Sequence, residues 1–306
     1  MFHADPQVDP EVNAMTENAP SPAPLTLRGV GGLSLTADAW GEPDGPLVLL
    51  LHGAGQTRQS WGNTGEALGA AGFRAIAMDW RGHGDSAWAP DGGYELTDFY
   101  ADLDAVLTGL ARPVHIVGAS LGGLAGMTLA AGGAHDIPAL VMVDVTPTLQ
   151  RDGVMRILTF MAARPDGFAS LEEAAAAMSQ YLPHRKRTPS AAGLKRVLRL
   201  RGGRWYWHWD PAFLNPRMVN PDPRRGERIV AQLTGAVRAL TTPTQLVVGR
   251  MTDMVGQEDI DQFLALAPHV EVVDVKDAHH MVAGDSNAAF TQAVAGFLRC
   301  QPGVRA

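Results

Sequence analysis

The chain has 306 residues, of which 46% are hydrophobic and 19% charged, and its formal net charge is −7 at pH 7. This composition is too apolar for a disordered chain and can supply a large core, so we expect one α/β core that carries an insertion. Because the negative charge is spread without long runs of one sign, neither nucleic acid nor a membrane surface is expected as a partner.

The beginning of the chain differs in composition from the rest. Residues 1–24 combine prolines and acidic residues with few large apolar ones, which predicts a mobile N-terminal arm. The arm has no basic segment followed by an apolar one, and no stretch of the chain is apolar enough to cross a bilayer. Cys300 is the single cysteine, which excludes an intrachain disulfide. We therefore expect a cytoplasmic protein, and whether it forms a homo-oligomer stays open.

From residue 25 onward, apolar segments of strand length alternate with amphipathic segments of helix length, a pattern typical of a parallel sheet with helices on both faces. Segments 25–30 and 33–40, separated by two glycines, predict an opening hairpin. The further predicted strands are 46–53, 73–80, 113–120, 138–147, 242–250 and 269–278, and the predicted helices are 58–71, 95–110, the segment after Ser120, 256–267 and 286–299. Residues 146–232 give no strand signal and predict a helical lid over the carboxyl edge of the sheet, between core segments 25–145 and 233–306.

The candidate nucleophile lies at one strand-to-helix junction. Gly118-Ala119-Ser120-Leu121-Gly122 matches G-x-S-x-G between an apolar strand and a helix of small residues. The sharp turn at such a serine requires flanking residues without bulk. The start of the helix places backbone N–H groups beside the serine, so the Leu121 N–H is a predicted oxyanion donor. A serine that only caps a helix is the alternative for a bare motif, and this context favours the nucleophile.

Five segments occur in a characteristic order between residues 47 and 298, namely LLLHGAGQTRQSW, AMDWRGHGDSAW, HIVGASLGGLAG, LVVGRMTDMV and DAHHMVAGD. With these segments the chain resembles the α/β-hydrolase superfamily, in its lidded branch of esterases and cofactor-free haloperoxidases. The resemblance implies a serine hydrolase without a cofactor, built on a mostly parallel, doubly wound, eight-stranded sheet with a helical lid inserted after the sixth strand. His52-Gly53 resembles the HG signature of the family, which implies that the Ala54 N–H is the second oxyanion donor and that His52 braces the loop.

A serine nucleophile needs a base, and histidine titrates in the useful pH range. In the tandem His279-His280, the resemblance makes His280 the base and leaves His279 where the family usually carries glycine. A metal site is the other interpretation of adjacent histidines, but no third and fourth ligands occur at a recognisable spacing, so no metal is expected. The acid that orients the base has two candidates at strand ends, Asp253 and Asp144. We expect Asp253, with Asp144 as a carboxylate that braces a loop.

Two further segments have unusual side chains. In RWYWHWD (204–210), three tryptophans alternate, so an extended backbone would place them on one side. They either anchor the lid or line a substrate pocket, and we expect anchoring with at least one ring within reach of substrate. The tentative substrate-binding residues are Trp61, Trp88, Trp205 and Trp207. DWRGHGDS (79–86) predicts a hydrogen-bonded loop beside the site, in which His83 is structural.

These residues together predict acyl transfer on Ser120 with a small-molecule substrate. We expect a carboxylic ester, thioester or lactone of modest size and largely apolar character. A perhydrolase or a carbon–carbon hydrolase with the same triad is the alternative. A ligand receptor with little turnover is the alternative of another class, and its hallmark would be a damaged triad.

Overall fold

The computed structural model describes residues 22–148, 150–183, 190–214, 223–276, 287–301 and 304. Eight strands form one sheet in the order β1-β2-β4-β3-β5-β6-β9-β10. The antiparallel opening hairpin consists of β1 (Ala23–Arg28) and β2 (Ser34–Trp40), and β2 pairs antiparallel with β4. The parallel strands are β3 (Leu47–Leu51), β4 (Arg74–Met78), β5 (Val114–Ala119), β6 (Leu140–Val143), β9 (Thr244–Gly249) and β10 (Glu271–Val275). The mostly parallel, eight-stranded sheet predicted from the sequence is confirmed.

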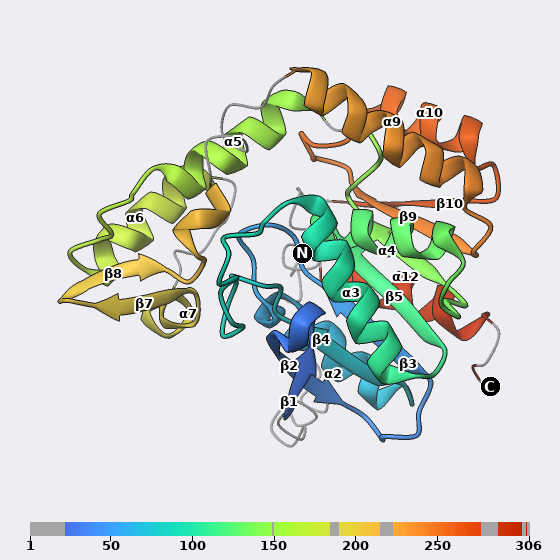
Figure 1. Cartoon of the computed structure of the whole chain (residues 1–306), viewed down its shortest axis with the longest axis horizontal. Helices are drawn as coiled ribbons and strands as arrows, with labels where there is room; N and C mark the ends of the chain where they lie inside the picture. Colours follow the sequence, from blue (N-terminus) through green and yellow to red (C-terminus); the bar gives the residue numbers. More distant parts are fainter. Residues whose placement is uncertain are drawn as a thin grey trace, which may run out of the picture.

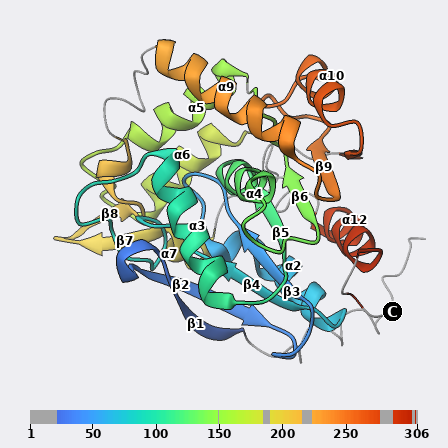
Figure 2. The same ribbon diagram turned by 45° about the vertical axis from the view of Figure 1, so that its right-hand side comes forward.

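Helices cover both faces of this sheet (Figures 1 and 2). One face carries α3 (Leu96–Leu110) and α4 (Leu121–Gly132), with α9 (Pro223–Ala239) beside α4 and α10 (Gln257–Leu266) beside α9. The other face carries α2 (Gly62–Ala70) and α12 (Asn287–Arg299), which contact each other. Two short 3-10 helices, η1 (Val30–Gly32) and η2 (Arg58–Trp61), lie in connections.

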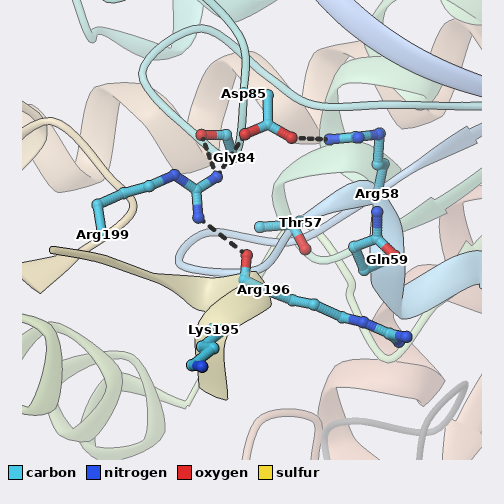
Figure 3. Close-up of a pocket in the computed structure, with 8 residues that line it drawn as sticks. All are labelled: Thr57, Arg58, Gln59, Gly84, Asp85, Lys195, Arg196 and Arg199. Atoms are coloured by element: carbon cyan, nitrogen blue, oxygen red, sulfur yellow. Dashed lines mark hydrogen bonds and ion pairs between the residues drawn. The ribbon is translucent and has the colours of Figure 1, made fainter. Parts of the chain in front are cut away.

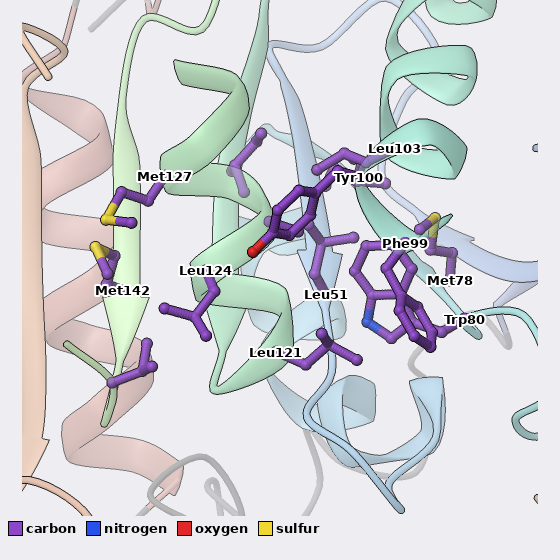
Figure 4. Close-up of a cluster of buried hydrophobic side chains, with 14 of the residues drawn as sticks. Leu51, Met78, Trp80, Phe99, Tyr100, Leu103, Leu121, Leu124, Met127 and Met142 are labelled. Carbon is purple, nitrogen blue, oxygen red and sulfur yellow. The ribbon is translucent and has the colours of Figure 1, made fainter. Parts of the chain in front are cut away.

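The central strand β3, which is apolar at every position, packs against both layers of helices. Leu49 and Leu51 of β3 point into the layer of α3 and α4, and Val48 and Leu50 into the layer of α2 and α12. Figure 4 shows the first layer, where Leu51 lies among aromatic and aliphatic side chains of α3, α4 and β4. Alternate residues of a strand point to opposite faces, so this run of buried leucines holds the strand from both sides.

The segment after β6 lies to one side of the sheet (Figure 1). It contains α5 (Arg151–Ala162), α6 (Leu171–Tyr181), α7 (Ala191–Val197), a hairpin of β7 (Leu198–Arg201) and β8 (Arg204–Trp207), and η3 (Pro211–Leu214). The lid, expected to be helical because its sequence gives no strand signal, also contains this hairpin, in which Gly202 and Gly203 adopt φ of 54° and 81° and close a two-residue turn. Helix α9 also continues through the expected boundary at residue 232. Within the residues described here, no helix has the length and apolarity needed to span a bilayer.

Candidate active site

Ser120 lies between the end of β5 and the first turn of α4. Its backbone is strained, with φ of 47° and ψ of −113°, and its N–H donates to the Val143 carbonyl at the end of β6 at 3.2 Å. The N–H of Leu121 is the first of the helix and has no acceptor within it. The turn therefore presents the Ser120 side chain and a free helix N-terminus at the carboxyl edge of the sheet.

Glycines allow this turn to form. A Cβ at Gly118 would lie 2.3 Å from the Gly122 carbonyl carbon, and one at Gly122 would lie 2.4 Å from the Leu51 carbonyl oxygen. Both contacts are with backbone, which has little freedom to move away. The strand and the helix can approach each other closely only because these two positions carry no side chain.

The expected second part of the oxyanion hole lies directly beside Ser120. A Cβ at Gly53 would lie 3.2 Å from the Ser120 Cβ. From Gly53 the chain turns through Ala54 and Gly55, whose φ is 72°, and the Gln56 N–H donates back to the Gly53 carbonyl at 3.1 Å. We call residues 53–56 the oxyanion turn. The structure thus places Gly53, the residue before Ala54, against Ser120 at the start of α4.

Two buried histidines, His52 and His83, hold the loops around this turn. His52 accepts from the Trp80 N–H at 3.1 Å and contacts the Gly53 carbonyl at 2.8 Å, which agrees with its predicted bracing role. Burial lowers its pKa to about 4. His83 accepts from the Gly55 N–H at 3.1 Å, and burial lowers its pKa to about 3. Both rings are therefore neutral near pH 7 and act as hydrogen-bonding groups.

Asp144 is the first residue after β6, the strand next to Ser120. Its side chain is completely buried, and its φ is 52°. Its carboxylate accepts from the Gly249 N–H at 3.2 Å and from the Thr252 hydroxyl at 2.6 Å. These donors hold the carboxylate in one orientation at the carboxyl edge of the sheet.

Asp253 has a different environment. Its side chain is 45% exposed and forms an ion pair with Arg156 of α5 at 2.7 Å. Asp253 therefore joins the loop after β9 to the lid. His279 and His280 lie outside the described residues.

The four tryptophans singled out in the sequence lie in separate surroundings. Trp61 is only 1% exposed and packs in the core against Phe290, so its ring contacts core side chains and not open solvent. Trp88 is 39% exposed and stacks under the guanidinium of Arg201. Trp205 and Trp207 belong to β8, and Trp207 stacks on Trp209 with ring centroids 5.0 Å apart.

Polar residues that alternate with the tryptophans of segment 204–210 make contacts with the core, and sequence reasoning missed them. His208 accepts from the Gly84 N–H at 2.7 Å, and Asp210 accepts from the Tyr94 hydroxyl at 2.6 Å. The signal was the alternation itself, because an extended chain that turns its tryptophans to one side turns His208 and Asp210 to the other. The anchor expected from the aromatic rings is thus made in large part by polar side chains.

Charged side chains line a second contact between lid and core (Figure 3). Asp85 accepts from Arg58 of the core at 2.8 Å and from Arg199 of the lid at 2.5 Å. A cavity of about 350 Å³ opens here, lined also by Lys195 and Arg196 of α7. Throughout the described ranges, no group of three His, Cys, Asp or Glu side chains is arranged to hold a metal ion.

Known proteins resemble this chain over most of its length. A family model described as alpha/beta hydrolase family matches residues 48–293. The chain is 31% identical to the esterase Rv0045c of Mycobacterium tuberculosis over 298 residues, which cover 94% of this chain and 93% of that protein. It is 30% identical to a 3-hydroxybutyrate-oligomer hydrolase of Cupriavidus necator over 252 residues, 79% of this chain and 85% of that one.

Solved structures show the same fold. The crystal structure of the M. tuberculosis esterase aligns with a TM-score of 0.72 and 30% identity, over 94% of this chain and 96% of that one. The crystal structure of E-2-(acetamidomethylene)succinate hydrolase aligns with a TM-score of 0.77 at 24% identity, over 91% of this chain and 100% of that one, and shows the fold alone. The chain therefore belongs to the alpha/beta hydrolase family, and its relatives are hydrolases that include esterases.

Proposed function

We propose that this protein is a serine esterase that cleaves a small carboxylic ester through an acyl-enzyme on Ser120. The observation that carries the proposal is the contact between two glycine-dependent turns. The oxyanion turn lies against the Ser120 Cβ, and Ser120 itself lies at the start of α4 with a positive φ. Two backbone donors beside a partly exposed nucleophile are what acyl transfer requires. The esterases among the relatives support the same chemistry.

In the first half of the proposed reaction, Ser120 Oγ attacks the ester carbonyl carbon while His280 takes the hydroxyl proton. The negative charge that forms on the carbonyl oxygen is stabilised by the N–H groups of Leu121 and Ala54, each worth about 3 kcal/mol. The C–O bond to the alcohol then breaks, and His280 gives its proton to the leaving oxygen. In the second half a water molecule attacks the acyl carbon, His280 takes its proton, and Ser120 Oγ leaves with that proton.

For the acid we propose Asp144, which reverses the order expected from the sequence. Asp144 is buried beside the strand that carries Ser120, and it is oriented by Gly249 and Thr252. An acid that stabilises an imidazolium should be held rigidly and shielded from water. Asp253 is half exposed and its charge is already paired with Arg156, so it suits a lid contact better.

For the substrate we propose an ester with a largely apolar acyl group. Met161 of α5 covers the oxyanion turn, because a Cβ at Gly55 would lie 3.0 Å from its sulfur. Phe160 stacks on Tyr181 and also contacts Trp207, so an aromatic group adjoins Met161 in the lid. Short hydroxyalkanoate esters are one candidate class, since a relative acts on 3-hydroxybutyrate oligomers.

The test combines covalent labelling with a substrate panel. A fluorophosphonate should label the wild-type protein and leave Ser120→Ala unlabelled. A panel of p-nitrophenyl esters of increasing chain length, run with a lactone, a 3-hydroxybutyrate dimer and a peracid assay, should give turnover that is highest for an ester. Absence of labelling in folded wild type would support the ligand receptor, and a faster peracid reaction would support perhydrolysis.

A further inference from the structure

His208 is a lid residue held between two loops of the core. It follows β8 directly and is only 1% exposed. Its Nδ1 lies 2.7 Å from the backbone nitrogen of Gly84, and its Nε2 lies 3.4 Å from the carbonyl oxygen of Gly55. One imidazole therefore spans the loop that carries His83 and the oxyanion turn.

The hydrogen-bond partners determine the tautomer of this ring. A backbone N–H can only donate, so the Gly84 N–H requires an unprotonated Nδ1 on His208. The single ring proton is then on Nε2, which donates to the Gly55 carbonyl. Burial lowers the pKa of His208 well below its usual value, so the ring keeps this neutral form at pH 7.

The peptide groups on both sides of Gly55 are thus held by imidazoles. The Gly55 N–H donates to His83, whose other nitrogen contacts the Arg81 carbonyl at 3.0 Å, so this ring belongs to the core. The Gly55 carbonyl accepts from His208, which belongs to the lid. The orientation of the oxyanion turn consequently depends on one core side chain and one lid side chain.

We propose that His208 is a positioning residue that aligns the oxyanion donor at Ala54 only when the lid is seated on the core. This inference rests on the proposed esterase function. The Gly55 carbonyl shares a peptide plane with the Gln56 N–H, which donates to the Gly53 carbonyl at 3.1 Å. The Gly53 carbonyl in turn shares its plane with the Ala54 N–H, so a rotation of the peptide that His208 holds displaces this donor. Donors in an oxyanion hole act only when they point at the developing charge.

The contrasting hypothesis is that His208 only anchors the lid and has no effect on catalysis. The chain offers a matched control for this hypothesis. Two residues along the same segment, Asp210 accepts from Tyr94 at 2.6 Å. This bond also ties the lid to the core, but neither residue has a hydrogen bond to the oxyanion turn among those found in the described residues. Tyr94→Phe therefore weakens the anchor and leaves the hydrogen bonds of Gly55 in place.

The experiment compares His208→Ala, His208→Gln, His208→Asn and Tyr94→Phe in the full-length protein, with a p-nitrophenyl ester that the wild type hydrolyses. The amide nitrogen of glutamine can replace Nε2 as donor to Gly55, and the amide oxygen of asparagine can replace Nδ1 as acceptor for Gly84. We expect His208→Ala to lower kcat about tenfold or more with KM within about twofold, because misalignment is a part of the loss that removal of a donor causes. His208→Gln should retain more activity than His208→Asn, and Tyr94→Phe should keep kcat within about twofold of the wild-type value.

A second readout separates alignment from folding. Binding of a trifluoromethyl ketone, which forms a tetrahedral oxyanion on the serine, should weaken in His208→Ala by the same factor as kcat/KM. Unchanged kcat in His208→Ala, asparagine equal to or better than glutamine, or an equal loss in Tyr94→Phe would each overturn the proposal. A wild type that neither labels nor hydrolyses any ester would instead refute the esterase function itself.

Discussion

The Thr252 hydroxyl donates a 2.6 Å hydrogen bond to the carboxylate of Asp144, although the two residues are separated by more than one hundred positions in the chain. Thr252 follows β9, and Asp144 follows the neighbouring strand β6. Adjacent parallel strands end at the same edge of a sheet, so the loop after β9 closes over the buried aspartate. Asp253 is the next residue of the same loop, and its side chain turns away to Arg156.

Asp144→Asn should therefore depress turnover far more than Asp253→Asn. The amide cannot stabilise an imidazolium, and in a serine triad this change costs on the order of 10³- to 10⁴-fold in kcat. Asp253→Asn breaks an ion pair of two half-exposed side chains, which is worth less than about 1 kcal/mol, or about fivefold. Steady-state kinetics on a p-nitrophenyl ester measures both.

Arg156→Gln is the control for this comparison, because it breaks the same ion pair from the lid side. If Asp253 acts only through Arg156, the two single variants and the double variant should have the same kcat/KM. A large loss in Asp253→Asn alone, with Arg156→Gln near wild type, would return the acid to Asp253.

The parts of the fold that were predictable are those that a repeating pattern specifies. The run Leu47–Leu51 is buried on both faces, and such strands read as continuous apolar segments. The nucleophile turn was predictable because its glycines are required by close backbone contacts that any similar turn would have.

Contacts that form between distant segments were not predictable in the same way. The choice of Asp144 over Asp253 as the proposed acid depends on which carboxylate the loop after β9 encloses. The neighbours of either residue in the sequence do not reveal this. The β7–β8 hairpin was missed although Gly202-Gly203 is a common two-residue turn, because arginines interrupt its short strands. Of its alternating leucines and tryptophans, Leu198 and Trp207 are buried, whereas Leu200 is 58% exposed.

Stability should depend on pH through the buried histidines. Burial lowers the pKa of His52 to about 4 and that of His83 to about 3 from the usual 6.5. Between the lowered pKa of each histidine and the usual 6.5, the unfolded chain binds protons that the folded protein does not. The free energy of unfolding therefore rises with pH in this window. The contribution is complete above about pH 6.5 and is lost as the pH falls toward about 4, by about 3 kcal/mol for His52 alone.

Urea denaturation between pH 7.5 and about 4.5, within the window that these pKa values set, measures this dependence. His52→Gln is the matched variant, because its amide oxygen can still accept from the Trp80 N–H and does not titrate. The variant should be less stable than wild type at pH 7.5 and should lose less stability on acidification. Parallel pH profiles for the two proteins would show that His52 is not protonated on unfolding.

Gly118→Ala should abolish activity and destabilise the fold, because its Cβ would lie 2.3 Å from a backbone carbon of α4. Strand β5 and helix α4 must then separate, at a cost of at least about 2 kcal/mol, and Ser120 moves away from the oxyanion turn.

Gly132→Ala in helix α4 is the control, since a Cβ there meets nothing within 4 Å. It should leave kcat/KM unchanged and raise stability by up to about 0.5 kcal/mol. Urea denaturation midpoints and ester kinetics measure the stability and activity of both variants. A fully active Gly118→Ala would mean that the close approach of β5 and α4 is not needed to position Ser120.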